Sequence, residues 1–169
     1  IAVPVHFDRC TFTDPPQLTG AQTRTLQFSD CELPGLDARL TTVRGDLRLS
    51  GSVVTGRTGL ENVQISGTLH LSRMRLVNPG GRALSGGGMV VGGGVAGRGG
   101  LVAEGETRFI GARVDGGLLL EGARFDNPDG VALCLDDLAT NRLSCRDGFT
   151  TSGQLQLRRA LARMVRDAR

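Results

Sequence analysis

The 169-residue sequence contains no lysine, no tryptophan and no tyrosine, and its only aromatic residues are six phenylalanines. A globular core of this size usually draws much of its buried area from large aromatic side chains, so aliphatic residues must supply it here. No run of eighteen apolar residues exists, which excludes a membrane-spanning helix. No signal peptide is recognisable, and because the chain begins at Ile1 without Met, we expect a processed product or an excised fragment.

The sequence also lacks any long run of residues with the same charge. Twenty arginines and seventeen acidic residues are interspersed and give a net charge of +3, which is typical of a mixed surface. We therefore predict no nucleic-acid partner. The replacement of every lysine by arginine is attributed first to genomic composition bias and only secondarily to a use of bidentate arginine chemistry.

The four cysteines (Cys10, Cys31, Cys134 and Cys145) form no CxxC pair and have no histidine-rich surroundings. This pattern argues against zinc. We interpret them as small buried side chains, and we expect Cys10 and Cys31 to be a reduced pair in a cytoplasmic protein, stacked on adjacent turns. A disulfide there would need Cβ atoms closer than the spacing of strands gives.

Glycine is abundant, with 26 residues, about twice its usual share. Each glycine in a helix interior costs about 1 kcal/mol relative to alanine, so a mainly helical fold is unfavourable. Collagen is excluded because the glycines do not recur at every third residue.

An internal repeat explains the glycines. Residues 65–84 align without a gap with residues 114–133, at an offset of 49. Within the repeat, Gly45, Gly56 and Gly67 follow one another at intervals of eleven residues. An eleven-residue period also fits a right-handed helical coiled coil, but the glycines and β-branched residues exclude that alternative.

Apolar or small residues recur at positions +2, +4, +7 and +9 of each eleven-residue unit. Two inward residues around one outward residue make a short strand, and the longer skip requires a corner. Two units close one coil of about 22 residues, which predicts a parallel β-solenoid of about seven coils over residues 1–157. The residues expected to form its buried columns are Leu47, Leu49, Leu69, Leu71, Leu118 and Leu120.

Two longer units interrupt the period at corresponding places, Asn78-Pro79-Gly80-Gly81 and Asn127-Pro128-Asp129-Gly130. Asn-Pro followed by glycine is a turn signal. We predict loops that bulge from the same edge of the solenoid, two coils apart.

The last segment, Arg158–Arg169, has a different pattern. Leu161, Met164, Val165 and Ala168 share one helical face among five arginines. This predicts a short basic amphipathic helix. It would cap the open end of the solenoid, or touch a membrane or a partner, or begin a missing segment. Membrane contact is expected only through Arg158–Arg169.

The elements GDLRLSG, GTLHLSRMRLVNPGGRAL and GGLLLEGARFDNPDGVAL resemble bacterial pentapeptide-repeat-like right-handed β-helix proteins. The resemblance covers nearly the whole chain and concerns residues that determine the fold. It implies an all-β, right-handed parallel β-helix, although the coils here are longer than strict pentapeptide repeats. Some long members of that group are described as membrane-associated oxidoreductases, but a shared fold does not transfer function.

Gly92–Gly97 satisfies the dinucleotide pattern G-x-G-x-x-G after the strand-like Met89–Val91, and Asp115 follows about twenty residues later. A dinucleotide site needs a helix that opens at these glycines. Further solenoid units follow instead, so we interpret the segment as glycine-rich corners and predict no bound cofactor.

Two other groups could carry chemistry. Asp126, Asp129, Asp136 and Asp137 form a local acidic group such as glycan enzymes use, but an NPDG turn explains Asp126 and Asp129, and no tryptophan or tyrosine can stack a sugar. His6 and His70 belong to no nucleophile or metal pattern, and we expect His70 to point outward, one coil above Arg48.

The sequence therefore predicts no catalytic, cofactor-binding or metal-ligating residue. The leading hypothesis is a non-catalytic structural or interaction module that acts through self-association or protein binding at its ends or faces. The alternative is a redox or glycan-directed enzyme. A gyrase-directed DNA mimic is a further alternative, against which the net charge of +3 argues.

Overall fold

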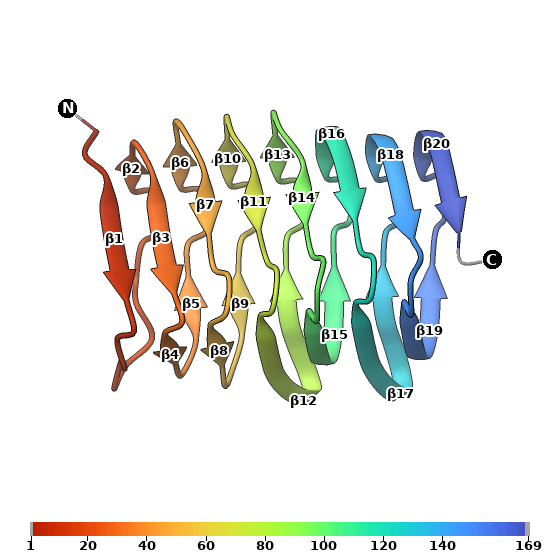
Figure 1. Ribbon diagram of the computed structural model, residues 1–169, viewed down its shortest axis with the longest axis horizontal. Coiled ribbons are helices and arrows are strands. Elements are labelled where there is room, and N and C mark those ends of the chain that lie inside the picture. Colours follow the sequence, from red (N-terminus) through yellow and green to blue (C-terminus); the bar gives the residue numbers. More distant parts are fainter. Residues whose placement is uncertain (1, 168–169) are drawn as a thin grey trace.

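Alternating inward and outward side chains make short strands, and corners between them wind the chain into a rod. The computed structural model, which describes residues 2–167, is an all-β parallel solenoid of about seven turns of about 23 residues (Figure 1). The two described ends of the chain lie at opposite ends of the rod.

Most strands in the first turns are two to four residues long, and the later strands run around a corner and reach seven or eleven residues. The strands are β1 Val5–Asp8, β2 Gln22–Thr23, β3 Leu26–Ser29, β4 Glu32–Leu33, β5 Leu36–Asp37, β6 Thr42–Val43, β7 Leu47–Arg48, β8 Val53–Val54, β9 Thr58–Gly59, β10 Gln64–Ile65, β11 Leu69–His70, β12 Arg75–Ser85, β13 Val90–Val91, β14 Val95–Ala96, β15 Val102–Arg108, β16 Arg113–Leu119, β17 Arg124–Cys134, β18 Ala139–Cys145, β19 Thr150–Gln156 and β20 Leu161–Asp167.

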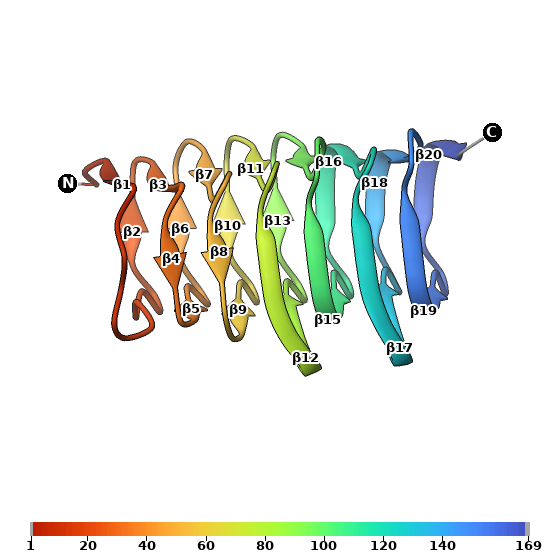
Figure 2. The same ribbon diagram turned by 60° about the horizontal axis from the view of Figure 1, so that its bottom comes forward.

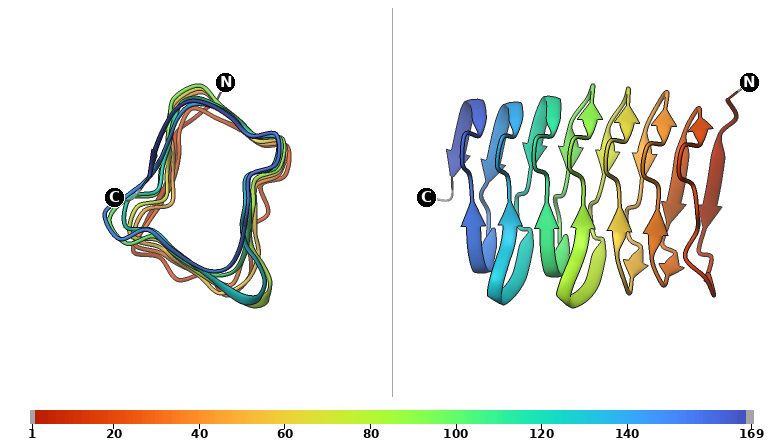
Figure 3. Two further views of the ribbon diagram at one scale, coloured as in Figure 1. Left: turned by 90° about the vertical axis from the view of Figure 1, so that its right-hand side faces the viewer. Right: turned by 180° about the vertical axis from the view of Figure 1, so that it is seen from behind.

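Each turn has four sides, and the strands of successive turns pair in parallel on each side. Face 1 comprises β4, β8 and the first halves of β12, β15, β17 and β19, and face 2 comprises β5, β9 and the second halves of those four strands. Face 3 comprises β2, β6, β10, β13 and the first halves of β16, β18 and β20, and face 4 comprises β1, β3, β7, β11, β14 and the second halves of β16, β18 and β20. Viewed along the rod, the turns superpose as an irregular four-sided outline (Figure 3).

The interior is made of residue columns that run the length of the rod. One column on face 4 advances by 21, 21, 22, 26, 23, 25 and 22 residues from turn to turn: Val5, Leu26, Leu47, Leu69, Val95, Leu118, Leu143 and Val165. The six leucines predicted to be buried are each at most 1% exposed, so the predicted core is confirmed. The steps are slightly longer on average than the predicted 22.

Two opposite corners of the outline are lined by residues with positive φ. The first column is Arg9, Asp30, Gly51, Arg73, Gly99, Gly122 and Asp147, and the second is Gly20, Leu40, Asn62, Gly88, Gly111, Asp137 and Arg159. Left-handed backbone is easy only for glycine and is tolerated by asparagine and aspartate. These sharp corners account for part of the glycine content.

The two Asn-Pro segments lie within β12 and β17 and project at the same corner, beyond the neighbouring turns (Figure 2). The side-chain amide of Asn78 donates a hydrogen bond of 2.9 Å to the Arg82 carbonyl, and Asn127 repeats this contact with Val131. β15 lies between them. The predicted position two turns apart is therefore confirmed, with extended backbone forming the projections.

The predicted C-terminal helix is wrong. Residues 161–167 form β20, which pairs with β18, while the last two residues of Arg158–Arg169 lie outside the described part of the chain. The error has a physical cause: a solenoid corner separates Ala162 and Val165 by three positions, opposite Thr140 and Leu143, and this spacing imitates one turn of a helix. Within residues 2–167, no helical segment has the length and apolarity needed to cross a bilayer.

Candidate functional site

The glycine-rich segment occupies a corner between faces 3 and 4. β13 ends at Val91 and β14 begins at Val95, and the next element after them is β15. A Cβ atom at Gly92 would lie 2.7 Å from the carbonyl oxygen of Ser66, and one at Gly93 would lie 2.7 Å from that of Gly67. These glycines therefore allow two turns to stack closely, which explains them without a phosphate.

The four acidic residues lie in two separate places. Asp126 is on face 1 and Asp129 is at the exposed tip of β17. Asp136 and Asp137 sit instead at the corner between faces 2 and 3, where Asp137 accepts hydrogen bonds of 2.6 and 2.8 Å from Arg159 in the last turn. This ion pair lowers the pKa of Asp137. Asp136 accepts a 2.8 Å hydrogen bond from the Arg158 backbone amide. The structure thus gives Asp136 and Asp137 a role in joining turns, and it does not bring the four carboxylates together.

Both histidines point outward on face 4, three turns apart. His70 lies beside Arg48 in register, as predicted. Its Nε2 is 3.2 Å from Asp46 Oδ2, and Asp46 Oδ1 accepts a 2.9 Å hydrogen bond from the Thr68 amide. The Thr68 amide and then His70 and Arg48 lower the pKa of Asp46, against the effect of its partial burial. The group holds adjacent turns together on the surface.

The four cysteines are all free thiols. Cys10 and Cys31 lie on adjacent turns, as predicted, since the residues that follow them form a parallel bridge between the turns. Burial raises the pKa of Cys31 and of Cys134, and burial together with the Glu121 carboxylate raises the pKa of Cys145 to about 11. A raised pKa keeps a thiol protonated and makes it a poor nucleophile.

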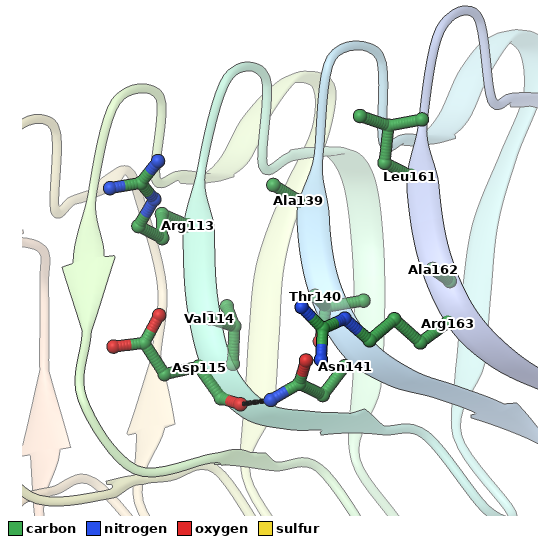
Figure 4. Close-up of a pocket in the computed structure, with 9 residues that line it drawn as sticks. All are labelled: Arg113, Val114, Asp115, Ala139, Thr140, Asn141, Leu161, Ala162 and Arg163. Atoms are coloured by element: carbon green, nitrogen blue, oxygen red, sulfur yellow. Dashed lines mark hydrogen bonds between the residues drawn. The ribbon is translucent and has the colours of Figure 1, made fainter.

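A shallow hollow of about 530 Å³ lies on face 3 near the C-terminal end (Figure 4). Arg113, Asp115, Asn141, Leu161 and Arg163 line it from three successive turns. The Asn141 amide donates a hydrogen bond to the backbone carbonyl of Asp115. The hollow is open to solvent and holds both signs of charge, unlike an enclosed and mostly apolar small-molecule site.

The sides of the rod carry ion pairs, many of which join neighbouring turns. Arg75 is 2.8 Å from Glu104, and Arg98 is 3.2 Å from Glu121, each pair bridging two turns. Such exposed pairs contribute little to stability individually. They do cover the faces with polar groups, so the exposed apolar residues stand out.

Leu161 and Leu40 are the most exposed large apolar residues, at 72% and 59%, but Leu161 lies in the outward column of Val90 and Leu40 lies at a corner. Exposed apolar residues of the inward columns lie at the two ends of the described rod. Leu155 and Leu157, in and just after β19, are 43% and 44% exposed, and Val3 at the other end is 56% exposed. The ring of Phe7 stacks on Phe28 at 5.0 Å between centroids, yet Phe7 is only half-buried. These residues occupy inward columns that no further described turn covers.

The sequence pointed to the N-terminal end at Ile1-Ala2-Val3 as the likelier contact surface, but Leu155 and Leu157 were not singled out. The signal was available, because both leucines obey the inward spacing and an inward residue of a terminal turn has a neighbour on one side only. The interpretation of Arg158–Arg169 as a helical cap hid this signal.

Comparison of the chain with protein-family models, with curated proteins and with solved structures finds no match.

Proposed function

We propose that this chain is a non-catalytic structural or interaction module that makes its contacts through the ends of the solenoid. The observation that carries the proposal is the concentration of exposed inward-type residues at those ends, with Val3 at one and Leu155 and Leu157 at the other. Terminal strands of a stack also present unpaired backbone donors and acceptors, which favour strand addition. Both features favour a partner that seats on an end.

The arrangement of the polar groups supports the same proposal. The acidic residues and histidines that could serve catalysis are divided between separate turns and corners. Among residues 2–167, no three His, Cys, Asp or Glu side chains are grouped to hold a metal ion. Their contacts join turns, as the Asp46–His70 and Asp137–Arg159 pairs illustrate. These turn-joining contacts give His70 and Asp137 a structural role, which supports the proposal.

The finer identification is also part of the proposal. The repeated elements GDLRLSG and GGLLLEGARFDNPDGVAL favour a place near the bacterial pentapeptide-repeat-like β-helix proteins. The four free thiols favour a reducing compartment, such as the cytoplasm.

Sedimentation velocity over a wide range of protein concentration tests the role of the ends. We expect the mass of the chain to rise with concentration, and Leu157→Asp to suppress this rise, because a carboxylate would be buried without a partner in the contact. Val90→Asp is the matched control, since Val90 is 41% exposed but lies in the middle of face 3. If Val90→Asp abolishes association and Leu157→Asp leaves it intact, the contact is on a face and the proposal is wrong.

A further inference from the structure

The two ends of the rod have matching outlines and the same strand polarity. The residue columns run from the first described turn to the last, and the turns superpose in projection (Figure 3). A second copy placed on the C-terminal end would therefore continue the columns on all four faces with parallel pairing. Two like ends could meet only after one copy is turned over, which makes the pairing antiparallel and mirrors the irregular outline.

In several inward columns the residues that would meet across such a junction are apolar on both sides, whereas the Phe12 column ends at Thr151 and the Phe7 column ends at Asp167. Leu18 of one copy lies in the column that ends at Leu157, and Val3 lies in the column that ends at Ala162. Cys10 similarly shares a column with Phe149. Leu18 and Cys10 are half-buried, as are Ala162 and Phe149. Each contact would complete the burial that an interior turn already has.

The charges at the two ends are opposite in sign. Residues 2–37 hold five carboxylates and two arginines, a net charge of −3, whereas residues 132–167 hold six arginines and four carboxylates, a net charge of +2. Opposite ends therefore attract within the Debye length of about 8–10 Å, and like ends repel.

We propose that the chain assembles head to tail, with the N-terminal end of one copy seated on the C-terminal end of the next, so that the solenoid continues across the junction. This inference rests on the proposed function, because it requires that the ends be contact surfaces. The contact is heterologous, so it does not close on itself and builds an open linear assembly.

Two variants, each with one blocked end, test the direction of the contact. Val3→Asp blocks the N-terminal end and Leu157→Asp blocks the C-terminal end, with Val90→Asp as the control that leaves both ends intact. Every head-to-tail junction needs one end of each kind. We therefore expect each blocked variant alone to be monomeric, and an equimolar mixture to form dimers and nothing larger, while the control assembles like the unmodified chain.

The mixture also separates a blocked contact from a misfolded one, since a misfolded variant could not restore dimers. Three results overturn head-to-tail assembly: an unmodified chain that is monomeric at every concentration, a Val3→Asp variant that still associates, or a mixture that stays monomeric. If Val3→Asp still associates while Leu157→Asp is monomeric, the contact joins two C-terminal ends. Head-to-tail assembly is then wrong, and the proposed function still stands. If the proposed function itself is wrong, a different result is expected: Val90→Asp would abolish association, and Val3→Asp and Leu157→Asp would leave it unchanged.

Discussion

Truncating two leucines of one column measures what a covering turn contributes. Leu133 and Leu155 are register partners on face 2, in adjacent turns. Leu133 is fully buried between Thr107 and Leu155, whereas Leu155 in the last described turn is 43% exposed. The local backbone and the chemistry of the substitution are closely matched, so the presence of a covering turn is the main difference.

We expect Leu133→Ala to lower the free energy of unfolding by about 2–5 kcal/mol, because it removes a fully packed side chain and leaves a cavity. Leu155→Ala should cost about 1 kcal/mol, since little more than half of the side chain is buried and solvent can fill the space. Urea unfolding of dilute protein measures both values, with equal m-values as the check that the same structure unfolds.

Equal losses for the two variants would refute the reasoning, because the last turn would then be as well covered as an interior one. The concentration dependence adds a second test. If copies stack head to tail, the cost of Leu155→Ala should rise with protein concentration, since assembly stabilises the folded state by mass action. The cost of Leu133→Ala should not rise.

Three further predictions concern the corners and the surface. Leu40 has a φ of 58° and is 59% exposed. Thermal unfolding should show that Leu40→Gly stabilises the fold by about 0.5–1 kcal/mol, because the relief of backbone strain exceeds the cost of the added chain entropy. A loss of stability would contradict this. Gly92→Ala should cost about 1–3 kcal/mol because its Cβ would meet a carbonyl 2.7 Å away, whereas Gly87→Ala, with its nearest neighbour at 3.6 Å, should stay within about 0.5 kcal/mol. Hydrogen bonding from Arg39 lowers the pKa of Asp37 from 3.8 to about 2. The ion pair therefore stabilises the fold above about pH 4, and this stabilisation is lost as the pH falls toward 2. Melting temperatures measured between pH 4 and pH 2 should fall less for Asp37→Asn than for the unmodified chain.

Much of the fold could be predicted because the solenoid interior repeats a rule that is visible in the sequence. Leu69 and Leu118 obey the same spacing from a glycine, and both are at most 1% exposed. Period-2 alternation with a fixed skip has few structural solutions, so the strands, corners and number of turns followed from it. The Asn-Pro projections were predictable for the same reason.

The last strand could not be recognised because corner spacing and helical spacing coincide over a few residues. Pairing with β18 decides the outcome: the Leu161 amide donates a 2.7 Å hydrogen bond to the Leu138 carbonyl, a non-local contact that local periodicity does not contain. The hollow on face 3 was hidden likewise, since Arg113 and Arg163 are 50 positions apart in the sequence and meet only through the stacking of turns.

Hydrogen exchange measured by mass spectrometry at low and high protein concentration tests the role of the ends most directly. In dilute protein, amides of the central turns should exchange slowly, and those of β1, β19 and β20 should exchange fast, because terminal strands of a stack open locally. At high concentration we expect protection to increase in β1 and in β19 and β20 together, and nowhere else. Protection that increases at one end alone, or along a face such as β13 and β16, would contradict the account.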